Sequence, residues 1–306
     1  MKVQKEENQQ LTFASMGILK IGLTNVLLGF FILCSANNNA EKNCSFGVFQ
    51  KITVRTDLEK FFSACNVKGC IVIFDNNKKQ LIVSDSVLAE SEKLPASTFK
   101  IINLLIALET GVIKNETEII KWPGQIDKVK YGYRPDIYHD MTVKEAFEVS
   151  AGWVFVELAK KIGLDNYRRY LKECNYGNQN LSEPGDDFWN FGKFGVSAIN
   201  QVNFIRNLYE GNLPFSARNM EIVKRVMKTE QTKNFTIYAK TGWTREGGIN
   251  TGWWVGFVET EQGVWYFATL LLQDRKVNSA NFGSCRKDIT KAIFNDLGVI
   301  NLEIGK

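Results

Sequence analysis

The stretch 95–100 of this 306-residue chain places Ser97 three residues before Lys100. Pro95 favours the start of a helix, Gly111 favours its end, and the residues between them are mostly apolar. The sequence therefore predicts a buried helix with both side chains on the same face of its first turn. A desolvated lysine can be neutral enough to accept the serine proton, so the chemistry that this pair suggests is acyl transfer.

Further stretches follow in the order that an acyl-transfer site needs. A Ser-x-x-Lys pattern occurs by chance, and a serine near a helix start is most often a cap. Ser150, however, interrupts two predicted helical segments, and 176–178 is a turn sequence. In 240–242, Lys240 supplies a positive charge at a strand end, and Gly242 lets a substrate approach the backbone. Each stretch alone could be a cap or a loop, but their conjunction favours catalysis.

Strand patterns near both ends of the chain flank a helical centre. Strands are predicted over 69–74, 80–83, 235–240, 252–259 and 264–272, and helices over 57–62, 97–111, 142–149, 154–162, 199–208, 220–227 and 284–297. The predicted fold class is α+β, with an antiparallel sheet formed from both chain ends and an inserted, mainly helical region. A single domain is expected over 41–306, with its sheet part at about 45–90 and 230–306 and its helical part at about 95–228.

Charge and residue counts exclude several classes of protein. The net charge of +5 comes from 38 basic and 33 acidic residues without a basic block, which argues against nucleic-acid binding. His139 is the single histidine, so neither a Ser-His-Asp triad nor a zinc site is expected. Among six cysteines, Cys65 and Cys70 are close enough in sequence to pair, and most of the others are expected to be buried thiols.

The N-terminal segment is typical of a secretory signal peptide. A basic start precedes the apolar run 18–33, and small residues and a polar spacer follow it. The predicted signal peptide is 1–36, with cleavage after Ala36 or Ala40, and Met16 is an alternative start. Export to the periplasm is therefore expected, and the alternatives are an uncleaved membrane anchor and lipid attachment at Cys34.

Over nearly the whole mature chain, the sequence resembles the class D, oxacillinase-type, serine β-lactamases. The matching segments are 95–100, 176–180, 187–189, 197–202, 240–242, 253–256 and Arg286. Such a series in one order is more specific than any single motif. The resemblance implies the β-lactamase/transpeptidase fold and β-lactam antibiotics as substrates, and the sequence leaves both a monomer and a homodimer open.

The resemblance also implies a covalent mechanism. Ser97 is expected to be the nucleophile that opens the β-lactam ring. Lys100 is expected to react with carbon dioxide or bicarbonate and become N6-carboxylysine, the general base, without a bound cofactor or metal. Trp189 would support this carbamate through its indole N–H, which is a donor only.

The same resemblance assigns the remaining site residues. Ser150, assisted by Lys240, would pass a proton to the leaving nitrogen. Thr241 and Arg286 would bind the substrate carboxylate, for which a guanidinium is well shaped. The backbone N–H of Trp243 would form an oxyanion hole with that of the nucleophile.

One position departs from the family pattern. Gly152 stands where the family usually has valine, and its open space is expected to admit water and weaken carbamylation unless Trp153 refills it. An alternative hypothesis is therefore a β-lactam sensor or penicillin-binding domain that is acylated but deacylates slowly. A cell-wall transpeptidase or carboxypeptidase is a third interpretation, although asparagine is more usual at the position of Gly152 in such proteins.

Overall fold

The computed structural model describes residues 51–277 and 281–302. The predicted signal peptide, 1–36, and the cysteines at 34 and 44 lie outside these residues. Within the described ranges, no helix combines the length and the apolar character needed to cross a membrane.

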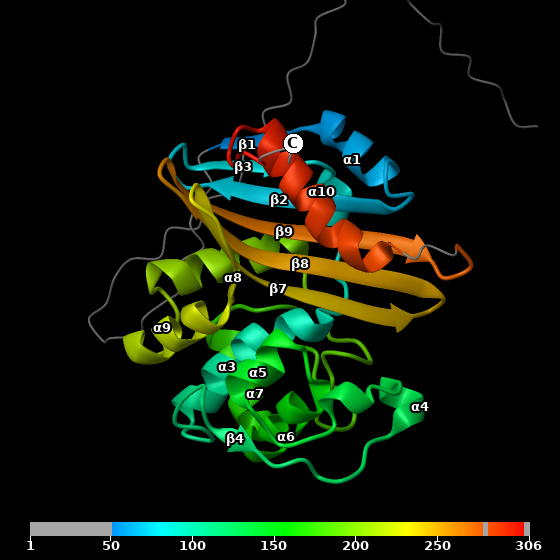
Figure 1. Cartoon of the computed structure of the whole chain (residues 1–306), viewed down its shortest axis with the longest axis vertical. Helices are drawn as coiled ribbons and strands as arrows, with labels where there is room; N and C mark the ends of the chain where they lie inside the picture. Colours follow the sequence, from blue (N-terminus) through cyan, green and yellow to red (C-terminus); the bar gives the residue numbers. More distant parts are fainter. Residues whose placement is uncertain (1–50, 278–280, 303–306) are drawn as a thin grey trace, which may run out of the picture. The chain divides into compact units, whose positions relative to one another are not determined.

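A seven-stranded sheet, built from both ends of the described chain, is the framework of the fold (Figure 1). Its order is β1-β3-β2-β9-β8-β7-β6. The predicted sheet is confirmed, and all its pairs are antiparallel except β1 with β3, which run parallel at one edge. The strands are β1 Lys51–Val54, β2 Lys68–Asp75, β3 Gln80–Val83, β6 Lys228–Gln231, β7 Phe235–Glu246, β8 Ile249–Thr260 and β9 Gly263–Asp274.

Helices cover both faces of this sheet. Helices α1 (Glu59–Ser63) and α10 (Phe282–Asp296) pack on one face, and the inserted helical region packs on the other (Figure 1). The inserted region contains α2 Ser86–Glu90, α3 Lys100–Glu109, α4 Lys128–Tyr131, α5 Val143–Glu148, α6 Gly152–Ile162, α7 Leu164–Glu173, α8 Ala198–Glu210 and α9 Ala217–Val226. Shorter elements are the 3-10 helices η1 Thr56–Leu58, η2 Ala96–Phe99 and η3 Pro135–Ile137 and the strand pair β4 Ile119–Ile120 with β5 Met141–Thr142.

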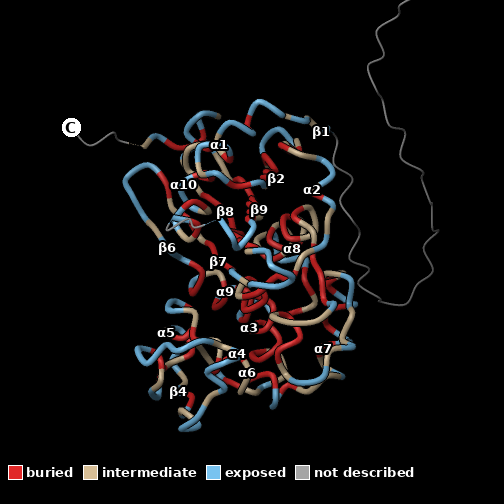
Figure 2. The backbone as a smooth tube through the Cα atoms, turned by 90° about the vertical axis from the view of Figure 1, so that its right-hand side faces the viewer, coloured by how far each residue is buried: buried red, intermediate tan, exposed pale blue. Residues whose placement is uncertain are grey.

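Helix α3 is the buried centre of the inserted region. Its residues from Lys100 to Leu108 are all buried, as the red tube at α3 in Figure 2 shows. The first turn of the predicted helix differs in type, because Ser97 lies in the 3-10 helix η2 and α3 begins at Lys100. Side chains three apart are eclipsed in a 3-10 turn, so the two residues still face the same side.

The disulfide of the described part joins Cys65 to Cys285, with 6.2 Å between their Cα atoms. The pairing of Cys65 with Cys70, which their closeness in sequence allowed, is therefore not formed, and Cys70 is a buried free thiol. Cys70 lies on β2 and is buried in the core shared with the inserted helices, whereas Cys65 packs with the core under α10. Opposite faces of the sheet thus separate two cysteines that are close in sequence.

Gly256 marks the closest approach between β7 and β8. It lies opposite Ala239 in the register, and a Cβ at this position would lie 2.6 Å from the Ala239 Cα and against the Tyr238 carbonyl. Backbone atoms cannot move aside locally, so we expect Gly256→Ala to lower the free energy of unfolding by about 3 kcal/mol or more. Urea denaturation measures this change. Gly152→Ala is the control, because no described atom outside its chain neighbours and the backbone of its own helix lies within 4 Å of a Cβ there. An equal loss in both variants would contradict the packing argument.

Candidate active site

Ser97 and Lys100 form a hydrogen-bonded pair at the start of α3. The Lys100 amine donates to Ser97 Oγ at 2.7 Å, and the lysine is only 1% exposed. Burial lowers the pKa of Lys100 to about 7. Its Nζ lies 5.2 Å from the centre of the Phe155 ring, and no carboxylate of the described residues forms an ion pair with it. A large fraction of this amine is therefore neutral near pH 7, next to a serine hydroxyl.

A chain of buried hydrogen bonds supports the turn that carries Ser97. The Tyr176 hydroxyl donates to Gln201 Oε1 at 3.0 Å, and Gln201 Nε2 donates to Thr98 Oγ1 at 2.9 Å. Thr98 Oγ1 in turn donates to the Pro95 carbonyl at 2.8 Å. The segments 176–180 and 197–202 therefore position the turn, a role that the sequence pattern did not reveal.

Trp189 packs directly beside this turn. Its indole stacks on Phe99 with 4.9 Å between ring centres, and its carbonyl accepts a hydrogen bond from the Ala96 N–H at 3.0 Å. Ala96 has a φ of +50°, a region that a residue with a Cβ rarely adopts. The Trp189 Nε1 is buried and has no hydrogen-bond partner among the described residues, so this donor is available for an additional acceptor.

Lys240 and Ser150 form a second lysine–serine pair. Lys240 on β7 is 4% exposed, and its Nζ donates to Ser150 Oγ at 3.0 Å. Burial, followed by repulsion from Lys100, holds the pKa of Lys240 well below its ordinary value. Ser150 lies between α5 and α6 with a φ of +61°, a strained conformation that aims its hydroxyl at Lys240.

The end of β7 and the first turn of α10 form another wall of the site. Arg286 Nη1 donates to the Gly242 carbonyl at 2.5 Å, and burial lowers the pKa of Arg286 to about 10. Thr241 is half-buried, and Trp243 is 39% exposed beside the guanidinium. A Cβ at Gly242 would lie 2.7 Å from the Pro95 carbonyl, so only glycine lets β7 run this close to η2.

Trp153 does not pack toward the open space beside Gly152. Its Nε1 donates to the Ile137 carbonyl at 2.7 Å, and its ring meets Trp122 edge-on with 5.0 Å between centres. Trp153 thus belongs to the packing of 122–138. The first turn of α6 keeps an opening at Gly152, as the glycine predicted.

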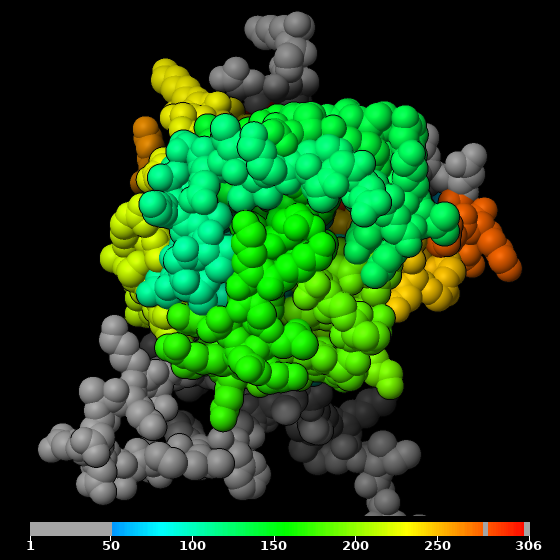
Figure 3. All heavy atoms as spheres, turned by 90° about the horizontal axis from the view of Figure 1, so that it is seen from below, coloured from blue at the N-terminus to red at the C-terminus, as the bar shows by residue number. Residues whose placement is uncertain are grey.

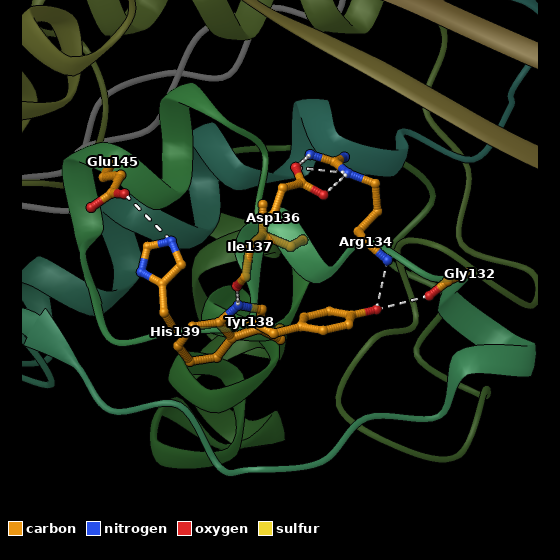
Figure 4. Close-up of polar contacts among 8 residues, drawn as sticks. Gly132, Arg134, Asp136, Ile137, Tyr138, His139 and Glu145 are labelled. Atoms are coloured by element: carbon orange, nitrogen blue, oxygen red, sulfur yellow. Dashed lines mark hydrogen bonds and ion pairs between the residues drawn. The ribbon is translucent and has the colours of Figure 1, made fainter.

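A network of polar contacts holds the segment that carries the Ile137 carbonyl (Figure 4). The Tyr138 hydroxyl accepts a hydrogen bond from the Arg134 N–H at 2.9 Å and donates to the Gly132 carbonyl at 3.0 Å. Arg134 pairs with Asp136 at 2.6 Å, and His139 lies 3.9 Å from Glu145 of α5. These contacts connect η3 to α5, which precedes Ser150.

Asp187 is a buried residue of the site region to which the sequence pattern assigned no role. It is 2% exposed, forms an ion pair with Lys130 at 3.0 Å and accepts a hydrogen bond from the Tyr131 hydroxyl. Helix α4 is thereby fixed to the segment that ends in Trp189. A cleft of about 540 Å³ lies beside this contact, between α4 and α6, on the face drawn in Figure 3.

A larger cleft, of about 980 Å³, contains none of the predicted site residues. It lies between the segments 92–94 and 192–195 and the ends of β8 and β9. In the described ranges, no cluster of three or more histidine, cysteine, aspartate or glutamate side chains is arranged to hold a metal ion. The two lysine–serine pairs therefore lie outside the larger cleft.

Comparisons with known proteins define the class and then the family. The family model of the penicillin-binding protein transpeptidase domain matches residues 69–295. β-Lactamase OXA-10 from Pseudomonas aeruginosa is 38% identical over 252 residues, which cover 81% of this chain and 91% of the relative. β-Lactamase OXA-2 from Salmonella typhimurium is 39% identical over 216 residues, which cover 70% of this chain and 75% of the relative.

The structural comparison gives the same family. The crystal structure of a class D β-lactamase from Sebaldella termitidis has a TM-score of 0.76 and 37% identity, and the match covers 82% of this chain and 99% of that structure. The chain belongs to the class D β-lactamases. The fold class and the family resemblance predicted from the sequence are confirmed.

The buried state of Lys100 predicts a dependence of stability on pH. Its pKa is about 7 in the folded chain against an ordinary 10.5, so the unfolded chain binds an extra proton between these values. In buffer free of carbon dioxide, we expect the stability of the wild type relative to Lys100→Met to rise over this window by up to about 1.4 kcal/mol per pH unit. Below pH 7 both states are protonated, and this dependence vanishes.

Urea denaturation between pH 6 and pH 9.5 measures this difference. The exposed Lys172→Met variant controls for the loss of one positive charge. If the difference in the free energy of unfolding between wild type and Lys100→Met stayed constant above pH 7, Lys100 would remain charged in the folded chain.

Proposed function

We propose that the chain hydrolyses β-lactams through an acyl-enzyme on Ser97, with carboxylated Lys100 as the general base. The observation that carries this proposal is the 2.7 Å hydrogen bond between Ser97 and a buried lysine whose pKa is about 7. Ser97 Oγ attacks the carbonyl carbon of the ring, the ring C–N bond breaks, and the nitrogen leaves as an amine after protonation. The names of the relatives, class D β-lactamases, support the same reaction.

Two features of the site fit a carbamate on Lys100. Only a neutral amine attacks carbon dioxide, and the burial of Lys100 supplies this form near pH 7. The Trp189 N–H, which has no partner among the described residues, matches an added anionic oxygen. When present, the carbamate supplies a general base for the serine and for the deacylating water.

Ser150 and Lys240 are proposed to deliver the proton to the leaving nitrogen. The 3.0 Å hydrogen bond between them lets the lysine replace the proton that the serine gives away. Because the pKa of Lys240 is lowered, its ammonium gives up a proton more readily than an exposed lysine does.

Thr241 and Arg286 are proposed to bind the substrate carboxylate, and the backbone N–H groups of Ser97 and Trp243 to bind the developing oxyanion. Thr241 and Trp243 follow Lys240 on β7, and Arg286 contacts the carbonyl of the residue between them. Arg286 forms no ion pair with a carboxylate of the described residues, and with a pKa of about 10 it stays charged at pH 7, so its field favours an anionic substrate.

We further propose an exported, periplasmic enzyme, with 1–36 as signal peptide and the domain from residue 41 onward. The Cys65–Cys285 disulfide supports this location, because such bonds persist mainly in oxidising compartments. An uncleaved membrane anchor is the alternative to cleavage.

A second candidate function is a β-lactam sensor or binding domain that stays acylated. The glycine at position 152 favours it: a Cβ there would have open space around it, and water that reached Lys100 past this glycine would stabilise the ammonium form and oppose carbamylation. The two candidates share the acylation step and differ in deacylation.

Turnover of a penicillin with and without bicarbonate separates the two candidates. We expect many turnovers, a kcat that falls as the pH drops below about 7 because the ammonium form cannot take up carbon dioxide, and partial recovery with bicarbonate. Lys100→Ala should lower kcat by about 10³-fold or more while the fold is kept, because general base and proton acceptor are lost together.

The controls are intact-mass measurements on the wild type and on Ser97→Ala. The serine variant should carry no acyl adduct. Undiminished hydrolysis by Lys100→Ala would refute the lysine mechanism, whereas one burst with a lasting adduct would identify a β-lactam-binding protein.

Gly152→Val tests the role of the open space. Positions 152 and 155 share one face of α6, so a valine would lie near the Phe155 ring that contacts Lys100. We expect the variant to reach half-maximal turnover at severalfold less bicarbonate, because a drier lysine stays neutral. The bicarbonate concentration that Gly152→Ala needs should lie between those of the wild type and Gly152→Val. An unchanged requirement in both variants would show that Gly152 does not affect carbamylation.

A further inference from the structure

The first turn of α10 carries Arg286 directly after Cys285, the partner of Cys65 in the disulfide. The two cysteines are 220 positions apart in the chain, and their pairing was not predictable from the sequence. We infer that this disulfide positions Arg286 to receive the substrate carboxylate. The inference rests on the carboxylate-binding role proposed above for Arg286.

The Cys65 end of the disulfide is attached to the middle of the sheet. Cys65 follows α1 and lies three positions before β2, and β2 pairs with β9 along its whole length. The carbonyl of the next residue, Asn66, accepts a hydrogen bond from Gln273 of β9 at 3.2 Å. The disulfide therefore fastens the start of α10 to a part of the fold that moves little.

At the other end of the disulfide, Arg286 must be placed accurately to bind a substrate carboxylate. Its Nη1 donates to Gly242 at 2.5 Å and its Nε to Gly283 at 2.9 Å, both backbone carbonyls. A guanidinium has five N–H donors, so donors remain for a carboxylate. A displacement of the turn by about 1 Å would separate them from a substrate held on Ser97.

Buried Phe282, whose ring centre lies 5.2 Å from that of Trp243, also holds this turn. The polar contacts constrain it less directly. The N-cap residue, Asn281, makes no side-chain capping bond among the described residues. The Thr269–Thr290 hydrogen bond, at 2.6 Å, lies one turn further along the helix. The exposed Lys60–Asp296 ion pair lies at the far end of α10, where such pairs contribute little. A disulfide, in contrast, restricts its Cα–Cα distance to roughly 4.4–6.8 Å.

The test compares a penicillin with its methyl ester, which lacks the carboxylate. Removal of the disulfide in Cys65→Ala/Cys285→Ala should raise KM for the free acid by about 5- to 10-fold, with little change in kcat. This is the loss of affinity expected when a hydrogen bond to a charged group is weakened. The ester should be affected much less. A general loss of structure would alter both substrates and kcat.

A dithiol reductant gives the same comparison on wild-type protein that has already folded. It transfers two electrons and two protons to the disulfide, leaves two thiols and becomes a cyclic disulfide itself. Cys65 is partly exposed and can be reached. Reoxidation should restore KM. Lys60→Gln removes an ion pair between α1 and α10 and should leave KM unchanged.

Arg286→Met separates this inference from the proposed function. It should abolish the preference for the free acid, and disulfide removal in that background should add no further change in KM. If Arg286→Met leaves the preference intact, the proposed role of Arg286 fails. If it abolishes the preference but disulfide removal affects acid and ester equally, or neither, the positioning inference is overturned and the proposed function stands.

Discussion

The burial of the Lys100 amine is the constraint on which the site depends. An ammonium taken out of water without a carboxylate partner is costly, so the folded chain favours the neutral amine. Lys100 is enclosed by α3 and the Phe155 ring, and Ser97 supplies its observed hydrogen bond. Desolvation thereby keeps a neutral amine beside Ser97, the proposed nucleophile. The apolar character of α3 is thus a chemical requirement as well as a packing feature.

Two residues beside the lysine–serine pairs have strained backbone conformations, which the surrounding structure stabilises. Ala96 precedes Ser97, and Ser150 belongs to the second lysine–serine pair. Both Ala96 and Ser150 have positive φ values, and such conformations cost about 1–3 kcal/mol each. The hydrogen-bond chain from Tyr176 to Thr98 and the burial of Asp187 against α4 hold the adjoining segments. Polar networks of this kind are rigid when every member has a partner. The stability of the inserted region therefore serves to hold two strained turns in place.

Local patterns predicted the parts of the structure that depend on local sequence. Runs rich in aromatic and β-branched residues, separated by turn sequences, predicted the sheet from both ends, and the apolar run after Ser97 predicted the buried helix. The parallel pairing of β1, the partner of Cys65 and the burial of Asp187 depend on segments that meet only in the folded chain. The turn that carries Ser97 also packs closely against Gly242, a residue 145 positions further along the chain. Spacing fixes which side chains share a face, whereas long-range packing decides what they meet.

The opening at Gly152 affects two steps of the proposed reaction in opposite directions. Carbamylation needs a dry lysine, because water stabilises the ammonium that cannot react with carbon dioxide. Deacylation needs a water molecule beside the acyl group on Ser97. A side chain at position 152 therefore favours the base and restricts the water, and a glycine does the reverse. Trp153 is held by Ile137 and Trp122. Under the proposed mechanism, the choice between rapid hydrolysis and a lasting acyl-enzyme would therefore depend on the residue at position 152.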